Sequence, residues 1–157
     1  MKNLSKLFIA VIGCELVGLL STPFTISSIP SWYAYLNKPP FSPPNWIFGP
    51  VWIMLYFLMG VSAFLIWEKG LKNKKVKRAQ NYFFIQLFFN FFWSVLFFGL
   101  HFPILGLIDI VALLISILFT SRAFFAISKL ASSLLLPYLL WVSFATILNI
   151  FIVILNR

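Results

Sequence analysis

The side chains best suited to a specific task in this sequence are aromatic rings that lie beside small or polar residues within apolar stretches. They form three pairs about one helical turn apart: Trp52 with Tyr56, Asn90 with Trp93, and Trp141 with Ala145. Large rings with a few convergent polar groups are typical of a pocket for a flat, hydrophobic ligand. Plain aromatic packing is the alternative, and the 20 phenylalanines of the chain support it. The residues alone leave both interpretations open.

Catalytic and metal chemistry find little support. The sequence has no Gly-rich phosphate loop, no cysteine–histidine cluster with metal-ligand spacing, and no acidic pair spaced for acid–base work. We therefore expect no metal site, no obligatory cofactor and no firm catalytic residue. The single histidine, His101, falls at an expected turn, where a solvated side chain is a more economical interpretation than a haem ligand.

Membrane-spanning helices must position these residues. Of the 157 residues, 62% are hydrophobic and 10% are charged, whereas about a quarter of an ordinary soluble chain is charged. Five apolar stretches are long enough to cross a ~30 Å hydrocarbon core, at about 5–24, 46–67, 79–100, 103–123 and 130–155. Their hydrophobicity is continuous rather than alternating, which excludes a transmembrane barrel. We expect an all-α membrane protein, with residues 1–157 forming a single five-transmembrane-helix bundle and residues 25–45 forming a capping loop.

The first apolar stretch is expected to remain as a helix rather than act as a cleaved signal, because Glu15 interrupts it and no clear cleavage site follows.

The distribution of basic residues predicts the orientation of the bundle in the membrane. One side of the membrane would hold ten of the basic residues: Lys2, Lys6, Lys69, Lys72, Lys74, Lys75, Lys77, Arg78, Arg122 and Lys129. The other side would hold only Lys38 and Arg157. This asymmetry predicts a cytoplasmic N-terminus and an outer C-terminus. The net charge of +9 is therefore explained by membrane topology and by contact with lipid headgroups, and we do not expect the protein to bind nucleic acid.

Two carboxylates lie at membrane depth, where polar side chains are costly and tend to face the protein interior. Neither Glu15 nor Asp109 has a basic residue at the same depth. Asp109 needs a proton or a donor such as a tyrosine hydroxyl or a backbone amide near Pro103. We expect both carboxylates to be structural. Polar stripes of the third and fourth spans should join helices through hydrogen bonds. The residues expected to do so are Gln86, Ser94, Ser116 and Thr120.

The stretch Trp32–Trp67 joins a proline-rich connector to the second apolar span. Its prolines forbid regular helix, and its large rings suit either a lid over a cavity or an interfacial aromatic belt. The residues that form its pattern are Trp32, Tyr33, Leu36, Lys38, Pro39, Pro43, Pro44, Phe48, Gly49, Pro50, Val51, Trp52, Leu55, Tyr56, Met59, Gly60 and Trp67. This pattern closely resembles the signature of the tryptophan-rich sensory protein, or translocator protein, family, also called the peripheral benzodiazepine receptor family. Further matches are NFFWSVLFFG from Asn90 and PYLLWVSFATILN from Pro137.

The resemblance covers nearly the whole chain and implies a five-helix bundle, commonly a homodimer, with a pocket capped by the first loop. Members of the family bind porphyrins, notably protoporphyrin IX and haem, and some bind sterols or synthetic drugs. The ligand-binding residues implied here are Trp32, Tyr33, Phe48, Trp52, Tyr56, Asn90, Trp93, Trp141 and Ala145. Trp52 and Trp141 also match two tryptophans implicated in light-dependent porphyrin breakdown in some bacterial members.

We therefore predict an integral membrane receptor for tetrapyrroles with a sensory or stress-response role, in contact with membrane lipid. The alternatives are a light-dependent porphyrin-degrading oxidase that uses Trp52 and Trp141, and a transporter of porphyrin or sterol. The family's C-terminal sterol pattern requires a tyrosine shortly before a basic residue. Here Arg157 follows no tyrosine later than Tyr138, so sterol recognition through that pattern is not expected.

Overall fold

The computed structural model describes residues 2–157, and all regular structure in this range is helical. The elements are α1 (Lys2–Ser31), η1 (Tyr33–Tyr35), η2 (Asn45–Ile47), α2 (Phe48–Trp67), α3 (Lys74–Ser94), the π-helical turn η3 (Val95–Gly99), α4 (Pro103–Phe125), α5 (Lys129–Ser133) and α6 (Leu136–Leu155). Five helical segments within this range are long and apolar enough to cross a membrane. The predicted five-helix fold is confirmed.

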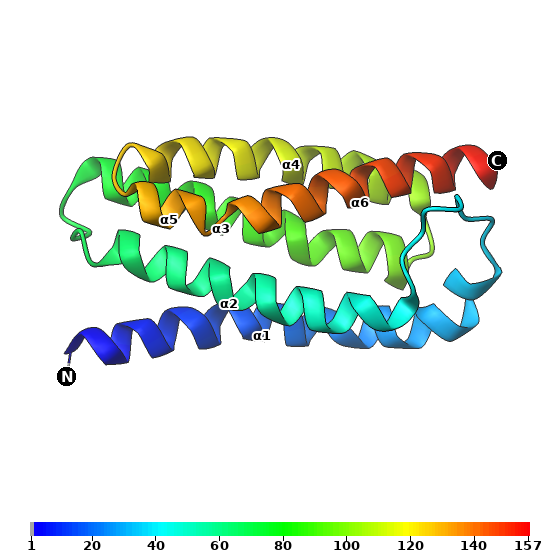
Figure 1. Cartoon of the computed structure of the whole chain (residues 1–157), viewed down its shortest axis with the longest axis horizontal. Helices are drawn as coiled ribbons and strands as arrows, with labels where there is room; N and C mark the ends of the chain where they lie inside the picture. The colour runs from blue at the N-terminus through cyan, green and yellow to red at the C-terminus, as the bar shows by residue number, and fades with distance from the viewer. Residues whose placement is uncertain (1) are drawn as a thin grey trace.

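The helices run back and forth along one long axis (Figure 1). The N-terminus, the α2–α3 loop and the α4–α5 turn lie at one end, which we call the basic end because the six basic residues of Lys69–Arg78, with Arg122 and Lys129, lie there. The α1–α2 connector, the turn before α4 and the C-terminus lie at the other end, which we call the connector end. Helix α1 is peripheral: 11% of its most apolar stretch is buried, against 39–44% in the other four segments.

The end of α1 differs from the prediction. Residues 25–31, assigned to the capping loop, continue the helix to Ser31 even though Pro23 and Pro30 lie inside it. Hydroxyls bond carbonyls one turn back in this segment, from Ser27 Oγ to the Pro23 carbonyl at 2.7 Å and from Ser31 Oγ to the Ser27 carbonyl at 2.6 Å. These bonds do not reach the carbonyls that the two prolines leave without an amide donor, which are those of Leu19 and Ile26. Because α1 continues to Ser31, the irregular connector is shorter than expected.

Two other boundaries differ for local reasons. Helix α3 starts at Lys74 rather than near residue 79, because the Asn73 side chain caps it by accepting a bond from the Lys75 amide at 2.9 Å. The predicted fifth span is divided into α5 and α6 by a break at residues 134–135. Pro137 lies in the first turn of α6, where its missing amide proton is tolerated.

Helices α1 and α2 touch at one level and are separated at another. A Cβ atom added at Gly60 would lie 2.5 Å from the Cα of Val11, so the two backbones meet there. One turn further toward the connector end, the Tyr56 ring lies over Gly18 on α1. Beyond Tyr56 a cavity lies between the two helices. The close contact at Gly60 thus fixes the inner limit of the cavity.

Candidate functional site

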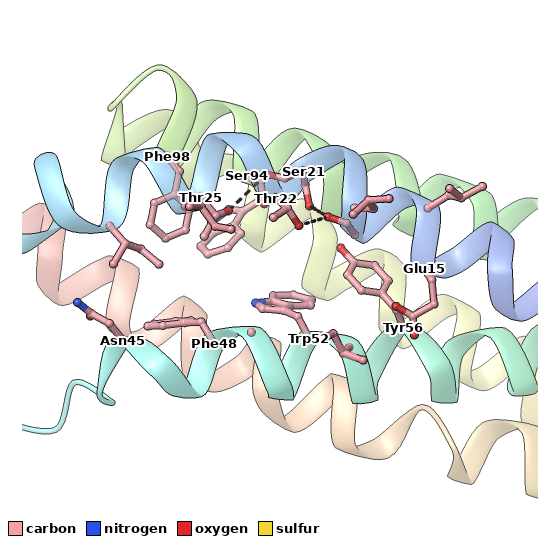
Figure 2. A pocket seen from close by; sticks show the side chains of 18 of the residues that line it. Glu15, Ser21, Thr22, Thr25, Asn45, Phe48, Trp52, Tyr56, Ser94 and Phe98 are labelled. Atoms are coloured by element: carbon pink, nitrogen blue, oxygen red, sulfur yellow. Dashed lines mark hydrogen bonds between the residues drawn. The ribbon is translucent and has the colours of Figure 1, made fainter.

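The cavity has a volume of about 790 Å³ and lies between α1, α2 and the connector end of α3 (Figure 2). Its lining is apolar and aromatic on α2 and α3 and carries hydroxyl groups on α1. The lining residues used below are Glu15, Gly18, Ser21, Thr22, Thr25, Asn45, Phe48, Gly49, Trp52, Tyr56, Trp93 and Phe98. Leu19, Ile26 and Ile53 also line it and remain 63–65% exposed. The cavity therefore opens sideways, between α1 and α2, at membrane depth.

Trp52 is the centre of the aromatic wall. Its ring centroid lies 5.6 Å from that of Tyr56 and 6.4 Å from that of Trp93, with interplanar angles of 32° and 35°. Trp52 also meets Tyr138 on α6 edge to face at 6.3 Å. Three neighbouring rings from two helices, tilted relative to one another, thus form one wall of the cavity, and their apolar faces suit a flat ligand.

A buried hydrogen-bonded chain holds the wall in place. The Tyr56 hydroxyl donates to Asn90 Oδ1, and Asn90 Nδ2 donates to the Tyr138 hydroxyl at 2.9 Å. Tyr138 in turn donates to Gln86 Oε1 at 2.7 Å. These groups come from α2, α3 and α6, so their bonds fix the orientation of the Tyr56 ring relative to both neighbours. The expected role of Gln86 in joining helices is confirmed. Ser116 and Thr120 instead donate to carbonyls of their own helix α4, those of Leu113 and Ser116.

Trp93 is fixed in a similar way. Its indole N–H donates to Asn149 Oδ1 at 3.3 Å, and Asn149 Nδ2 donates to the Pro103 carbonyl at 3.0 Å. Its ring stacks on Phe97 with centroids 5.4 Å apart.

Asp109, one of the two carboxylates at membrane depth, has its Oδ2 atom buried with no hydrogen-bond partner among residues 2–157. The donor expected for this carboxylate is therefore not found in that range.

The structure brings together four of the nine predicted ligand-binding residues at the cavity: Phe48, Trp52, Tyr56 and Trp93. Asn90 lies behind the wall as the hydrogen-bond partner of Tyr56. Trp141 lies behind Phe48, with ring centroids 6.1 Å apart, and its indole N–H is buried without a partner among the described residues.

The other three predicted residues are also outside the cavity lining. Ala145 is buried one turn beyond Trp141 on α6. Tyr33 is buried against Phe48 at 6.1 Å and Phe98 at 5.7 Å, and burial raises its pKa to about 12. Trp32 stacks on His101 at 4.7 Å. The two connector residues therefore cover the end of the wall without entering the cavity.

The α1 side of the cavity was missed by sequence reasoning. Ser21 Oγ and Thr22 Oγ1 both donate to the Gly18 carbonyl at 2.8 Å, and Thr25 Oγ1 lies 3.5 Å from the Ser21 carbonyl. Gly18, Ser21 and Thr25 recur every three or four residues, so they lie on one face of α1. Glu15 continues this face one turn earlier and lines the cavity half-buried. The regular spacing of these small and polar residues is the sequence feature that could have predicted the α1 wall of the cavity.

The connector is attached to the bundle just before its start and in its middle. Near its start, Ser28 Oγ donates to the Phe98 carbonyl at 2.5 Å and lies 3.0 Å from His101 Nε2. In its middle, the Asn37 amide donates to Asn156 Oδ1 and Asn156 Nδ2 donates to the Asn37 carbonyl, both at 2.9 Å. Lys38 caps the same segment by donating to three carbonyls at 2.8–3.2 Å. The connector is thus fixed to the bundle, and it contributes Asn45 and Trp46 to the cavity lining.

Within residues 2–157, no group of three or more His, Cys, Asp or Glu side chains lies close enough to hold a metal ion. The chemistry available at the cavity is therefore binding through apolar area, ring faces, hydroxyl groups and the carboxyl group of Glu15.

Comparison with known proteins agrees with this architecture. The model of the TspO/MBR family matches residues 10–155. The chain is 46% identical to the tryptophan-rich protein TspO of Archaeoglobus fulgidus, over 98% of this chain and 99% of that protein. It is 42% identical to the tryptophan-rich protein TspO of Chlorobaculum tepidum, over 99% and 98%. The human translocator protein is 39% identical over 75% of this chain and 70% of its own length. The resemblance found in the sequence is confirmed, and with five apolar helices the chain is an integral, multi-pass membrane protein of the TspO/MBR family.

Proposed function

We propose that this protein is a membrane receptor that binds a tetrapyrrole, such as protoporphyrin IX or haem, in the cavity between α1 and α2. The observation that carries the proposal is the wall of three neighbouring rings, Trp52, Tyr56 and Trp93, beside about 790 Å³ of mostly apolar space. That volume lies within the ~300–1,000 Å³ range of small-molecule sites. A macrocycle would lie against the ring faces and be covered at one end by the connector.

The polar groups suggest how such a ligand would be oriented. Asn45 lies at the connector end of the cavity, where α2 begins and the membrane surface is near. Its amide can donate to ligand carboxylates while the macrocycle stays at membrane depth. The far end of the cavity, at Glu15, lies at membrane depth and, within the described part of the chain, offers no basic side chain to a ligand carboxylate. We infer that the carboxylates point toward the connector.

A sensory role agrees with the names of relatives. A protein of Cereibacter sphaeroides that is 35% identical over 75% of this chain is called a tryptophan-rich sensory protein. Light-dependent porphyrin oxidation is the second candidate, because Trp52 borders the cavity and Trp141 contacts the wall residue Phe48. Under this alternative the bound porphyrin would be consumed under illumination.

The decisive experiment fills the cavity without disturbing the fold. A Cβ atom added at Gly49, which lines the cavity, meets nothing within 4 Å. Gly49→Phe should therefore place a ring in the cavity and weaken saturable quenching of tryptophan fluorescence by protoporphyrin IX at least tenfold in apparent affinity. Gly13→Phe is the matched control, because Gly13 is equally open but does not line this cavity. Unchanged binding in Gly49→Phe would refute the site. Light-dependent loss of the porphyrin absorption bands in the unsubstituted protein would favour the oxidase.

A further inference from the structure

A second cavity, of about 670 Å³, lies on the opposite side of α1, between α1 and α3. Small residues of α1 face phenylalanines of α3 across it: Ala10, Gly13, Cys14, Phe84, Phe88 and Phe91. The amide of Gln80, which also lines it, already donates to the Ala63 carbonyl at 2.9 Å. The lining therefore favours hydrocarbon over any polar ligand. We call this cavity the α1–α3 groove.

The depth of the groove matches one leaflet. Its α1 lining extends from Ile9 to Leu20, and at about 1.5 Å per helical residue this covers roughly 16 Å. Half of a ~30 Å hydrocarbon core has nearly the same depth. The groove starts at the basic end, where Trp67 and Leu71 line it, and its α1 lining stops at Leu20, in the middle part of the apolar span Asn3–Ser31. One acyl chain of a lipid in that leaflet would follow this path.

The mouth of the groove is positively charged. Leu71 lies between Lys69 and Lys72 in the exposed α2–α3 loop, and further basic residues follow at the start of α3. From α1, the ammonium group of Lys6 lies 5.8 Å from the centroid of the Trp67 ring. The one acidic residue in this region is Glu68. A headgroup above the groove would therefore meet mostly positive charge, with Trp67 at the level where tryptophans favour the interface.

We propose that the α1–α3 groove is a binding site for an anionic phospholipid, whose acyl chain lies along α1 while its phosphate contacts Lys6 and Lys72. The two features are independent of each other, since the groove comes from packing and the charge comes from the loop. The site is also separate from the proposed ligand cavity. A zwitterionic lipid would fill the groove without the gain from the basic mouth, and a second copy of the chain would cover it and exclude lipid.

Quenching by brominated lipid tests the headgroup preference. The protein is reconstituted in phosphatidylcholine with equal fractions of dibrominated phosphatidylglycerol or dibrominated phosphatidylcholine. Quenching at the groove is taken as the difference between the protein and its Trp67→Phe variant. We expect phosphatidylglycerol to associate several-fold more strongly. Lys6→Gln with Lys72→Gln should remove most of this preference, since each basic side chain near a membrane contributes roughly fivefold. Arg122→Gln with Lys129→Gln removes the same charge at the same end, away from the groove, and should preserve the preference.

Filling the groove tests the position of the acyl chain. An added Cβ at Gly13 meets nothing within 4 Å, so Gly13→Leu should fold normally and occupy the groove. It should reduce quenching at Trp67 by phosphatidylglycerol at least twofold, whereas Gly49→Leu, in the other cavity, should leave it unchanged. Equal quenching by the two lipids would overturn the proposal, and so would indifference to Gly13→Leu. Absence of quenching by either lipid, with Gly13→Leu converting a dimer to a monomer, would assign the groove to a second copy instead.

Discussion

The contact between α1 and α2 at Gly60 leads to a quantitative prediction. A Cβ atom at this position would lie 2.5 Å from the Cα of Val11, 3.0 Å from its amide nitrogen and 3.0 Å from the carbonyl oxygen of Ala10. Carbon atoms normally approach to about 3.5–4.0 Å. All three obstacles are backbone atoms, which cannot rotate away as a side chain can. Gly60→Ala must therefore push the two helices apart by roughly 1 Å.

The magnitude follows from two opposing terms. Overpacking a close contact costs about 1–3 kcal/mol, whereas replacing glycine by alanine within a helix contributes about 0.5–1 kcal/mol in its favour. Gly60→Ala should lose roughly 0.5–2 kcal/mol of unfolding free energy. Gly13→Ala is the matched control, since its added methyl group meets open space. It keeps only the favourable term, so the two variants should differ by about 1–3 kcal/mol.

Unfolding of the purified protein in mixed micelles, followed by circular dichroism as the fraction of denaturing detergent increases, measures this difference. The order of stability should be Gly13→Ala, then the unsubstituted protein, then Gly60→Ala. Equal stability of the two variants would show that α1 and α2 do not touch at Gly60. The inner limit assigned to the ligand cavity would then be wrong as well.

Two further predictions concern the polar contacts. Asn90→Leu removes the acceptor of the Tyr56 hydroxyl and the donor to Tyr138, and should cost about 1–3 kcal/mol of unfolding free energy. In that background Tyr56→Phe should cost less than it does alone, and strictly additive losses in the double-mutant cycle would contradict the network. Asn156→Ala removes both bonds to the Asn37 backbone. If these bonds stabilise the closed connector by about 1.4 kcal/mol, their loss should raise the rate of amide hydrogen exchange at residue 37 roughly tenfold. Unchanged exchange there would mean that α6 does not hold the connector.

The number and order of the membrane helices could be predicted from hydrophobicity, because crossing a bilayer requires long apolar stretches. Their ends could not. Residues 25–31 are rich in Ser and Thr and contain Pro30, so they resemble a loop, yet they continue α1 to Ser31. The basic residues that start α3 lie outside any apolar window, and a single Asn73 cap places them in the helix.

The candidate site was predicted on one side only. Sequence spacing placed Trp52 and Tyr56 on one helix face, the family resemblance added Phe48, and all three line the cavity. The opposing α1 wall depends on where α1 rests against α2, which the contact between Gly60 and Val11 decides. Likewise, no periodicity places Trp32 on His101, since their stacking joins the connector to a turn about seventy residues away.

The sideways opening of the ligand cavity determines which concentration governs its occupancy. Leu19, Ile26 and Ile53 border the opening at membrane depth, while Asn45 and Trp46 line the connector end of the cavity. A hydrophobic ligand would then reach the site from the bilayer. Its occupancy of the site would depend on its mole fraction in the lipid rather than on its molar concentration in water. Adding empty vesicles at a constant total ligand concentration should lower occupancy in proportion to the added lipid. Apparent dissociation constants would agree between preparations only when expressed per lipid.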